Sequence, residues 1–167
     1  MTAQGSAPGR PADPWEAGGR TAAAQLSAIS SAVVIGTDPD RAARAAVGIA
    51  RAESARRRVA LGDLVGDLAP LYAVAGGEDA IGLSDCFRDG LSMNDIARPA
   101  PESGSLFILP AGTPPVTPAA IAAHERWLRL VNGFSQAGAL LVLVARLDAP
   151  GLDALAATTD GVVAVDL

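Results

Sequence analysis

Short aliphatic runs recur along the chain, and longer segments with other patterns separate them. The runs lie at residues 30–35, 59–61, 106–109, 140–144 and 162–165. Uninterrupted aliphatic runs of this length are typical of strands that are buried on both faces of a parallel sheet. The pattern therefore predicts about five parallel strands.

Helices are predicted in the segments beside and between these strands. Their ranges are 16–27, 40–56, 67–74, 84–88, 92–97, 119–136 and 152–158. We expect Asp40, Ser84 and Ser92 to cap three of them, because an oxygen on such a side chain accepts a hydrogen bond from the first helical turn. The alternation of strands and helices implies right-handed crossovers. The predicted fold class is therefore α/β, with three layers and helices on both faces of the sheet.

The composition favours one domain with an aliphatic core. Residues 1–14 are rich in Gly, Pro and Ala without periodicity, which predicts a disordered leader before a single domain at 15–167. The 167 residues suffice for such a domain. Apolar residues make up 50% of the chain and aromatic residues only 4%, so the core is expected to consist of Ala, Val, Leu and Ile.

Charge and hydropathy argue against several kinds of partner. The net charge of −5 disfavours nucleic acid and an anionic membrane surface. The longest aliphatic run, 139–145, is too short to span a bilayer, and no secretory signal is visible at the start. The single Cys86 excludes an internal disulfide. We expect a cytoplasmic protein without direct membrane insertion.

Two loop motifs lie near the predicted carboxyl ends of strands, where α/β sheets bind ligands. They are 82–85, Gly-Leu-Ser-Asp, and 108–112, Ile-Leu-Pro-Ala-Gly. Further matching positions are 91–96, Pro115, Pro118 and Arg126. In this order, the motifs resemble those of the bacterial tyrosine kinases of exopolysaccharide synthesis, in the MinD/ParA-like branch of P-loop ATPases. The resemblance runs from about Ser30 to the end of the chain and implies a P-loop NTPase-like fold.

The segment that matches the phosphate-binding loop departs from the family pattern. Such a loop needs glycines, a Lys for the phosphates and a Ser or Thr for Mg²⁺. The matching residues are Gly36, Thr37, Asp38, Pro39, Asp40, Arg41, Ala42, Ala43 and Arg44. Only the first is a glycine, and the positions of the last Gly, the Lys and the Ser/Thr fall on Ala42, Ala43 and Arg44. The chain has no lysine, because all 13 of its Lys and Arg residues are arginines.

The acidic motifs of the family are also incomplete. Asp63 matches the first aspartate after the second strand, whereas Val65 falls at the second. The strand that should end in a metal-associated Asp supplies only aliphatic residues and then Arg146, with Asp148 as a displaced acid. We therefore predict no catalytic residue, no metal site and no cofactor, with Asp63 as a residual acid.

These departures lead to three hypotheses. The first is a non-catalytic homologue that acts through protein contacts in polysaccharide synthesis or export, with a membrane-bound chain-length regulator or an active kinase relative as partner. The regulator would recruit it to the inner face of the membrane. The second is a weak or altered ATPase or kinase that binds ATP with Mg²⁺. It would use Arg41 and Arg44 in place of the missing Lys, with Asp63 and Asp148 as its acids. The third is a structural remnant with a regulatory partner of another kind.

Other features of the family are only partly present. The kinases resembled carry a tyrosine-rich tail, whereas Tyr72 is the only tyrosine here. Their oligomerisation helix carries a Glu followed by two spaced arginines, which Glu16 and Arg20 match in part, so homo-oligomerisation stays open.

Structural roles, not functional ones, are predicted for four further features of the sequence. His124 is expected to be a half-buried structural residue and Cys86 an ordinary buried thiol. The arginines at 56–58 are expected to complement the negative end of a helix. Trp127 is expected in the core or, if exposed, in an interface.

Overall fold

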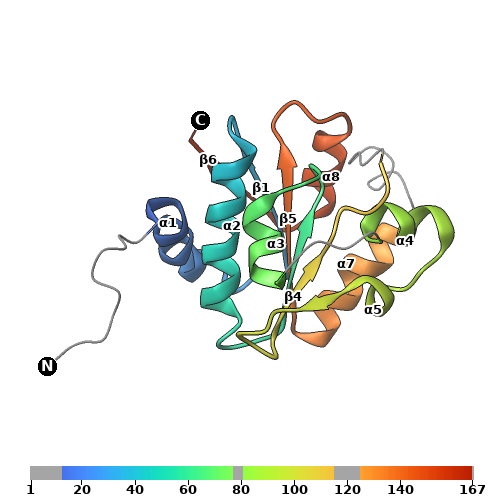
Figure 1. Ribbon diagram of the computed structural model, residues 1–167, viewed down its shortest axis with the longest axis horizontal. Helices are drawn as coiled ribbons and strands as arrows, with labels where there is room; N and C mark the ends of the chain where they lie inside the picture. The colour runs from blue at the N-terminus through green and yellow to red at the C-terminus, as the bar shows by residue number, and fades with distance from the viewer. Residues whose placement is uncertain (1–12, 77–80, 115–124, 167) are drawn as a thin grey trace, which may run out of the picture.

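A single mixed sheet organises the chain in the computed structural model, which describes residues 13–76, 81–114 and 125–166 (Figure 1). The strands are β1 (Ser31–Gly36), β2 (Val59–Asp63), β3 (Arg98–Pro99), β4 (Leu106–Leu109), β5 (Leu140–Arg146) and β6 (Gly161–Val165). Their order in the sheet is β3-β4-β2-β5-β1-β6. All pairings are parallel except that of β3 with β4.

The five predicted strands are confirmed, and a sixth was missed. Strands β1 and β2 are buried at every residue, which is why most of their residues are aliphatic. Strand β3 has two residues, one of them Pro99, and pairs antiparallel at the edge of the sheet. An edge strand this short carries no periodic signal, and proline is tolerated there because one side of the strand needs no partner.

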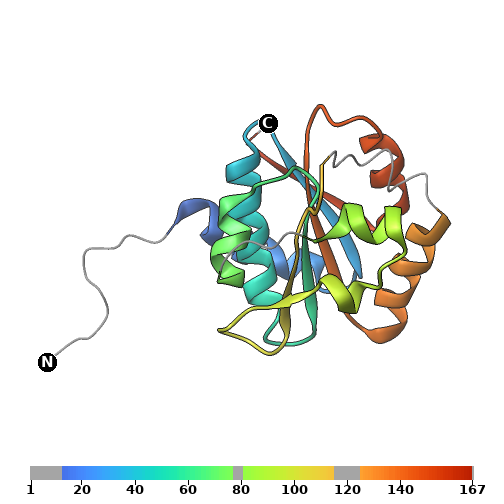
Figure 2. The same cartoon turned by 45° about the vertical axis from the view of Figure 1, so that its right-hand side comes forward.

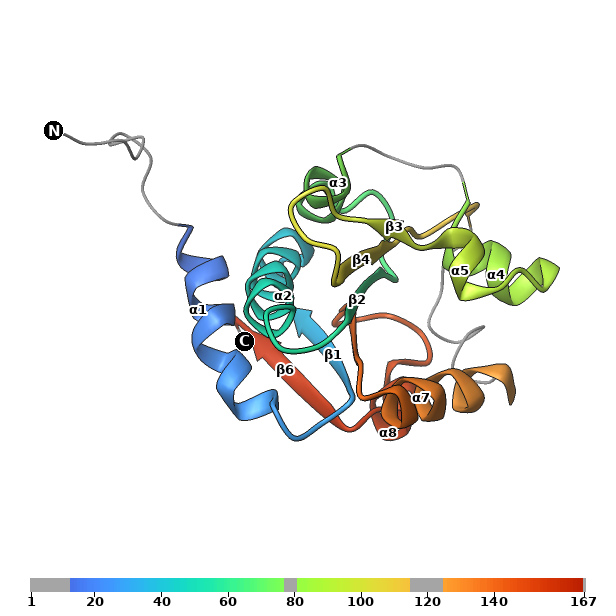
Figure 3. The same ribbon diagram turned by 90° about the horizontal axis from the view of Figure 1, so that it is seen from below.

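Helices cover both faces of the sheet, as predicted (Figures 1 and 3). On one face lie α2 (Pro39–Glu53) and α3 (Ala69–Ala75), with α1 (Pro14–Ala23) packed along α2 and followed by the short 3₁₀ helix η1 (Ala24–Leu26). On the other lie α4 (Leu83–Asp89), α5 (Met93–Ile96), α7 (Glu125–Ala137) and α8 (Leu152–Thr158). Within the described residues, no helix is long and apolar enough to cross a membrane.

The sheet separates two aliphatic cores. The core under α2 and α3 contains Val34, Leu61 and Val142, and the core under α4 and α7 contains Val33 and Leu141. Alternate residues of one strand therefore face opposite layers. Trp127 belongs to the second core and is fully buried, so it is a core residue and not an exposed interface anchor.

Two predicted helix caps were wrong, and the third is confirmed. Asp38, not Asp40, caps α2: its carboxylate accepts from the backbone N–H of Asp40 at 2.9 Å, and Pro39 occupies the first helical position. Helix α4 begins after Gly82, so Ser84 lies inside it. For α2, two aspartates two residues apart could each act as the cap, and sequence alone did not rank them. For α4 the cap is a glycine, which offers no side-chain acceptor to predict from. Ser92 caps α5 as predicted.

Several predicted boundaries shift by a few residues. Helix α1 begins at Pro14 with Asp13 as its cap, and α2 ends at Glu53 instead of Arg56. Helix α3 begins at Ala69 because Asp67 has a positive φ of 55°, which is outside the helical region. The predicted helix at 119–136 is described only from its residue 125 onward, and His124 lies outside the described residues.

Helices α1 and α2 approach each other unusually closely. A Cβ atom at Gly19 of α1 would lie 2.0 Å from the carbonyl oxygen of Ala45, and one at Gly48 of α2 would lie 2.0 Å from that of Glu16. Only glycine fits at either position, because a Cβ this near a backbone oxygen would force the helices apart. The two glycines therefore fix how α1 docks on the domain.

Candidate functional site

The chain passes from β1 into α2 through a very short connection. Strand β1 ends at Gly36, and only Thr37 and the cap Asp38 precede α2. The N-terminus of a helix at this edge of a sheet is the place where a phosphate binds in many α/β proteins, because backbone N–H groups point outward there. Here the Asp38 carboxylate takes the N–H of Asp40, and Pro39 has no N–H to offer. Of the first residues of α2, Asp40 therefore has its N–H bound by a carboxylate of the same chain, and Pro39 has no N–H to donate.

Both arginines of this segment are paired with carboxylates of the same chain. Arg41 forms an ion pair with Asp166 after β6 and lies 3.5 Å from Asp38. Arg44 lies 2.8 Å from Asp40 and 3.1 Å from Asp13. Asp40 and then Asp13 raise the pKa of Arg44, because both negative charges favour the guanidinium cation.

The two alanines between these arginines face the protein interior. Ala42 and Ala43 have no exposed surface and belong to the core between the sheet and α2. Ala43 is the residue that the sequence resemblance predicts at the Lys position of a phosphate-binding loop. A side chain at this position would therefore have to displace core atoms before it reached a bound phosphate.

Asp63, the predicted residual acid, lies fully buried at the end of β2. Its Oδ1 accepts from the backbone N–H groups of Val65 and Gly66 at 2.8 and 2.7 Å. Its Oδ2 accepts from the N–H of Leu68 at 3.3 Å and from the hydroxyl of Tyr72 at 2.9 Å. With four donors around two oxygens, the carboxylate holds the loop between β2 and α3 together.

Tyr72 is the residue of this edge that sequence reasoning missed. Its hydroxyl donates to Asp63 and accepts from the N–H of Ala111, at 3.2 Å, in the loop after β4. Burial is the main cause that raises the pKa of Tyr72, so the hydroxyl keeps its proton at neutral pH. A signal existed, because a buried tyrosine hydroxyl usually finds a polar partner and Asp63 lies nine residues upstream, just after a predicted strand.

The two loop motifs that carry the family resemblance are locked together. The carbonyl oxygens of Pro110 and Ala111 accept from the N–H groups of Leu83 and Ser84 at 2.7 and 3.0 Å. A Cβ at Gly82 would lie 2.1 Å from the oxygen of Pro110. Both motifs thus act as one packing unit at the carboxyl edge of the sheet.

Asp85 completes this unit from inside α4. Its Oδ2 accepts from the N–H groups of Gly82 at 2.9 Å and Thr113 at 3.2 Å. Gly112 between the loops has φ of +88°, and a Cβ there would lie 2.6 Å from Asp85 Oδ2. Burial alone would raise the pKa of Asp85, but the hydrogen bonds from Thr113 and Gly82 and the charge of Arg88 outweigh it and lower the pKa.

The lowered pKa makes the locked loops sensitive to acid. We expect Asp85→Asn to lose about 1–2 kcal/mol of the free energy of unfolding at neutral pH, because one acceptor oxygen becomes a donor. Asp85 contributes stability above the ordinary carboxyl value of 3.8 and loses it as the pH falls through the lower pKa of the folded state. The gap between wild type and variant should therefore shrink as the solution becomes acidic.

Urea denaturation from neutral pH to about pH 2.5 measures this gap. The matched control is Asp89→Asn, which changes an exposed aspartate at the end of the same helix. A gap that stays constant over the acidic range, or that Asp89→Asn reproduces, would show that the Asp85 carboxylate is not the source.

The loop after β5 holds the displaced acid predicted from the sequence. Asp148 Oδ1 lies 3.0 Å from Nε of Arg146, and both side chains are exposed. The hydrogen bond and then the charge of Arg146 lower the pKa of Asp148. Over residues 13–76, 81–114 and 125–166, no group of three or more His, Cys, Asp or Glu side chains is arranged to hold a metal ion.

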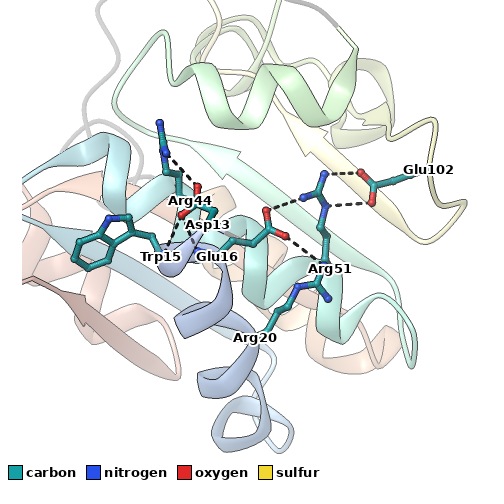
Figure 4. A network of polar contacts seen from close by, with 7 residues as sticks. All are labelled: Asp13, Trp15, Glu16, Arg20, Arg44, Arg51 and Glu102. Carbon is teal, nitrogen blue, oxygen red and sulfur yellow. Dashed lines mark hydrogen bonds and ion pairs between the residues drawn. The ribbon is translucent and has the colours of Figure 1, made fainter. Parts of the chain in front are cut away.

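A chain of ion pairs fastens α1 to the rest of the domain (Figure 4). Glu16, which partly matches the oligomerisation motif, pairs with Arg20 at 3.3 Å and with Arg51 of α2 at 2.7 Å. Arg51 also pairs with Glu102 at 2.9 Å. Asp13 accepts from the N–H groups at the start of α1 and pairs with Arg44. The acid of the motif thus makes its contacts within this chain.

The sequence interpretations of Cys86, Arg56 and Arg57 agree with their contacts, whereas Arg58 makes no ion pair at the helix end within the described residues. Cys86 is buried, its thiol donates to the carbonyl of Leu91 at 2.8 Å, and burial raises its pKa. Arg56 and Arg57 pair with Glu53 at the end of α2 at 2.7 and 2.8 Å. These two cations are therefore bound to a helix end rather than held in an open patch.

Comparison with known proteins identifies the fold. No model of a protein family and no curated protein matches the chain. The solved kinase domain of VpsO matches with a TM-score of 0.72 and 16% identity, over 90% of this chain and 80% of that one. The chimerical protein CapA2B2 matches with a TM-score of 0.72 and 15% identity, over 95% and 74%. The tyrosine kinase domain of BceF matches with a TM-score of 0.53 and 19% identity, over 78% and 52%.

These likenesses bear out the predicted fold class. The chain has the three-layer α/β fold of these kinase domains, with a six-stranded, mostly parallel sheet. The sequence identities are low, so the comparison defines the architecture alone. The chemistry depends on the residues of this chain.

Proposed function

We propose that this chain is a non-catalytic relative of the exopolysaccharide tyrosine kinases that acts through protein contacts in polysaccharide synthesis or export. One observation carries the proposal. At the N-terminus of α2, the capping carboxylate of Asp38 accepts from the N–H of Asp40, and the arginines that could replace the missing Lys are paired with acids. The fold shared with kinase domains and the interlocked loop motifs support the kinase-like origin.

The electrostatics of this edge oppose a bound nucleotide. A triphosphate would approach the carboxylates of Asp38 and Asp40, and it would have to separate Arg41 and Arg44 from them before gaining a cation. Each charge-assisted hydrogen bond that the missing Lys and hydroxyl do not supply is worth about 1.5–3 kcal/mol. Micromolar binding corresponds to about 8 kcal/mol in total, so the loss of several such bonds removes a large part of it.

A thermal-shift titration with ATP and Mg²⁺ tests this part of the proposal. A site tighter than about 100 μM would raise stability by more than about 1 kcal/mol at millimolar ligand, and Tm by about 2–4 °C. We expect no shift of this size. A shift of several degrees that Arg44→Ala abolishes would favour the second hypothesis, a weak or altered ATPase that uses arginine in place of lysine.

The proposed partner is a membrane-bound regulator of polysaccharide chain length, or an active kinase relative. Such a partner would hold this cytoplasmic protein at the inner face of the membrane, and self-association is an alternative assembly. Crosslinking in cells followed by purification through this chain tests the contact. We expect the regulator or the kinase to copurify. A monomer that captures neither would contradict the proposal independently of the nucleotide result.

A further inference from the structure

Helices α5 and α7 lie on the same face of the sheet (Figure 2). A hollow of about 490 Å³ opens on this face, between the two helices and the sheet. It lies where β2 begins and just before β5, at the amino ends of these strands. Its lining residues include none of the residues 36–44 at the start of α2. Its lining comes from α5, from α7 and from the sheet between them. Its volume is in the range of small-molecule sites in proteins, about 300–1,000 Å³.

The walls of this hollow are largely apolar. Phe107 of β4 is only half-buried beside it, and Leu130 and Phe134 line it from α7. Gly133, on the same helix, would meet no atom within 4 Å if it carried a Cβ. Of the sheet residues in the lining, Val59, Ala60 and Leu109 are buried, so Phe107 supplies the apolar sheet surface that stays accessible between α5 and α7.

Two arginines at this hollow differ from the other basic residues of the domain. Arg58 and Arg129 are exposed and line the hollow. Within the described residues, neither side chain forms a hydrogen bond or an ion pair, whereas Arg41, Arg44 and Arg51 each pair with two acids. In an acidic chain with 18 Asp and Glu against 13 Arg, two cations without an acid partner at one apolar hollow are unexpected.

We propose that this hollow binds a small amphipathic anion, with an apolar body against Phe107 and Phe134 and one acidic headgroup at Arg58 and Arg129. Guanidinium groups bind carboxylate, phosphate and sulfonate oxygens through directed pairs of hydrogen bonds. An apolar body gains by covering the half-buried side chains of Phe107, Leu130 and Phe134, and the headgroup supplies the charge that the protein leaves unmatched. The site is separate from the N-terminus of α2, so it does not depend on the proposed function.

Fluorescence titration of the full chain with 8-anilinonaphthalene-1-sulfonate tests the site. The matched neutral probe is N-phenyl-1-naphthylamine, which has the same rings without the sulfonate. We expect the anionic probe to bind at least about tenfold more tightly than the neutral one. Arg58→Gln and Arg129→Gln should each weaken the anionic probe about three- to tenfold and leave the neutral probe unchanged.

Filling the hollow gives a second, independent variant. Gly133→Leu should weaken both probes by about tenfold or more, because the new side chain occupies the space that they need. The control is Gly18→Leu, at a helical glycine that also has open space around its Cβ position but lies on α1. Circular dichroism establishes that each variant is folded, since unfolded or molten states bind the anionic probe for unrelated reasons.

Two results would overturn the proposal. One is equal affinity for the two probes with no effect of either arginine variant. This result would mean that the hollow is an apolar surface that does not select anions. The other is unchanged binding in Gly133→Leu, which would place the probe elsewhere on the molecule. Amide chemical shifts that move at 133 and 107 during the titration, and not on α1, would support the site directly.

Discussion

Replacing Asp63 by alanine should lower the free energy of unfolding by about 3–5 kcal/mol. The carboxylate is fully buried and accepts from three backbone N–H groups and the Tyr72 hydroxyl. Alanine leaves these donors without an acceptor, and each unsatisfied buried donor costs about 1–3 kcal/mol. Because a domain is stable by only about 5–15 kcal/mol in total, this one side chain supports a large part of the fold.

Urea denaturation followed by circular dichroism measures the loss. The control is Asp89→Ala, at an exposed aspartate, for which we expect a change within about 0.5 kcal/mol. If Asp63→Ala does not fold, Tyr72→Phe tests the same contact, with an expected loss of about 1–2 kcal/mol in the free energy of unfolding. The milder Asp63→Asn and Tyr72→Phe should couple in a double-mutant cycle by about 0.5–3 kcal/mol.

The result bears on the chemistry as well as on the fold. A carboxylate occupied by four donors has no free oxygen for a metal ion, and addition of Mg²⁺ should not stabilise the wild type. If Asp63→Ala were as stable as wild type, and Mg²⁺ stabilised wild type but not the variant, Asp63 would be a metal-binding acid. The non-catalytic interpretation would then fail.

The second large effect is expected at the contact between α1 and α2. Gly19→Ala should cost about 2–3 kcal/mol, because its Cβ would lie 2.0 Å from the carbonyl oxygen of Ala45 and neither backbone can yield without separating the helices. The neighbouring Gly18→Ala should instead stabilise the protein by about 0.5–1 kcal/mol, because its Cβ meets open space and alanine is the better helix former.

Two adjacent glycines on one helix thus make a matched pair. Thermal and urea denaturation give the two stabilities, and the fluorescence of Trp15, whose ring lies 5.2 Å from the Arg41 guanidinium, reports whether α1 stays docked. Equal stabilities for the two variants would mean that α1 is held by its ion pairs alone and not by close backbone packing. A change in Gly18→Ala with none in Gly19→Ala would contradict the described contact outright.

Long-range pairing explains most of what the sequence analysis missed at the candidate site. Arg41 pairs with Asp166, which is 125 residues away along the chain, and Tyr72 accepts from Ala111, 39 residues away. No local pattern identifies such partners, because only the folded sheet brings the carboxyl ends of its strands to one edge. The same limit applies to helix caps, where two nearby oxygens compete and local geometry selects one.

The sequence by itself determined the layered α/β architecture and the absence of any lysine. Strands buried on both faces must be aliphatic, and side-chain identity does not depend on folding. Only the tertiary structure decided that Asp63 accepts hydrogen bonds from the Tyr72 hydroxyl and from a loop. It also decided that, within the described residues, two arginines without acid partners line one hollow. The reason is that hydrogen bonds and ion pairs act over a few ångströms in space, and folding alone sets which groups come that close.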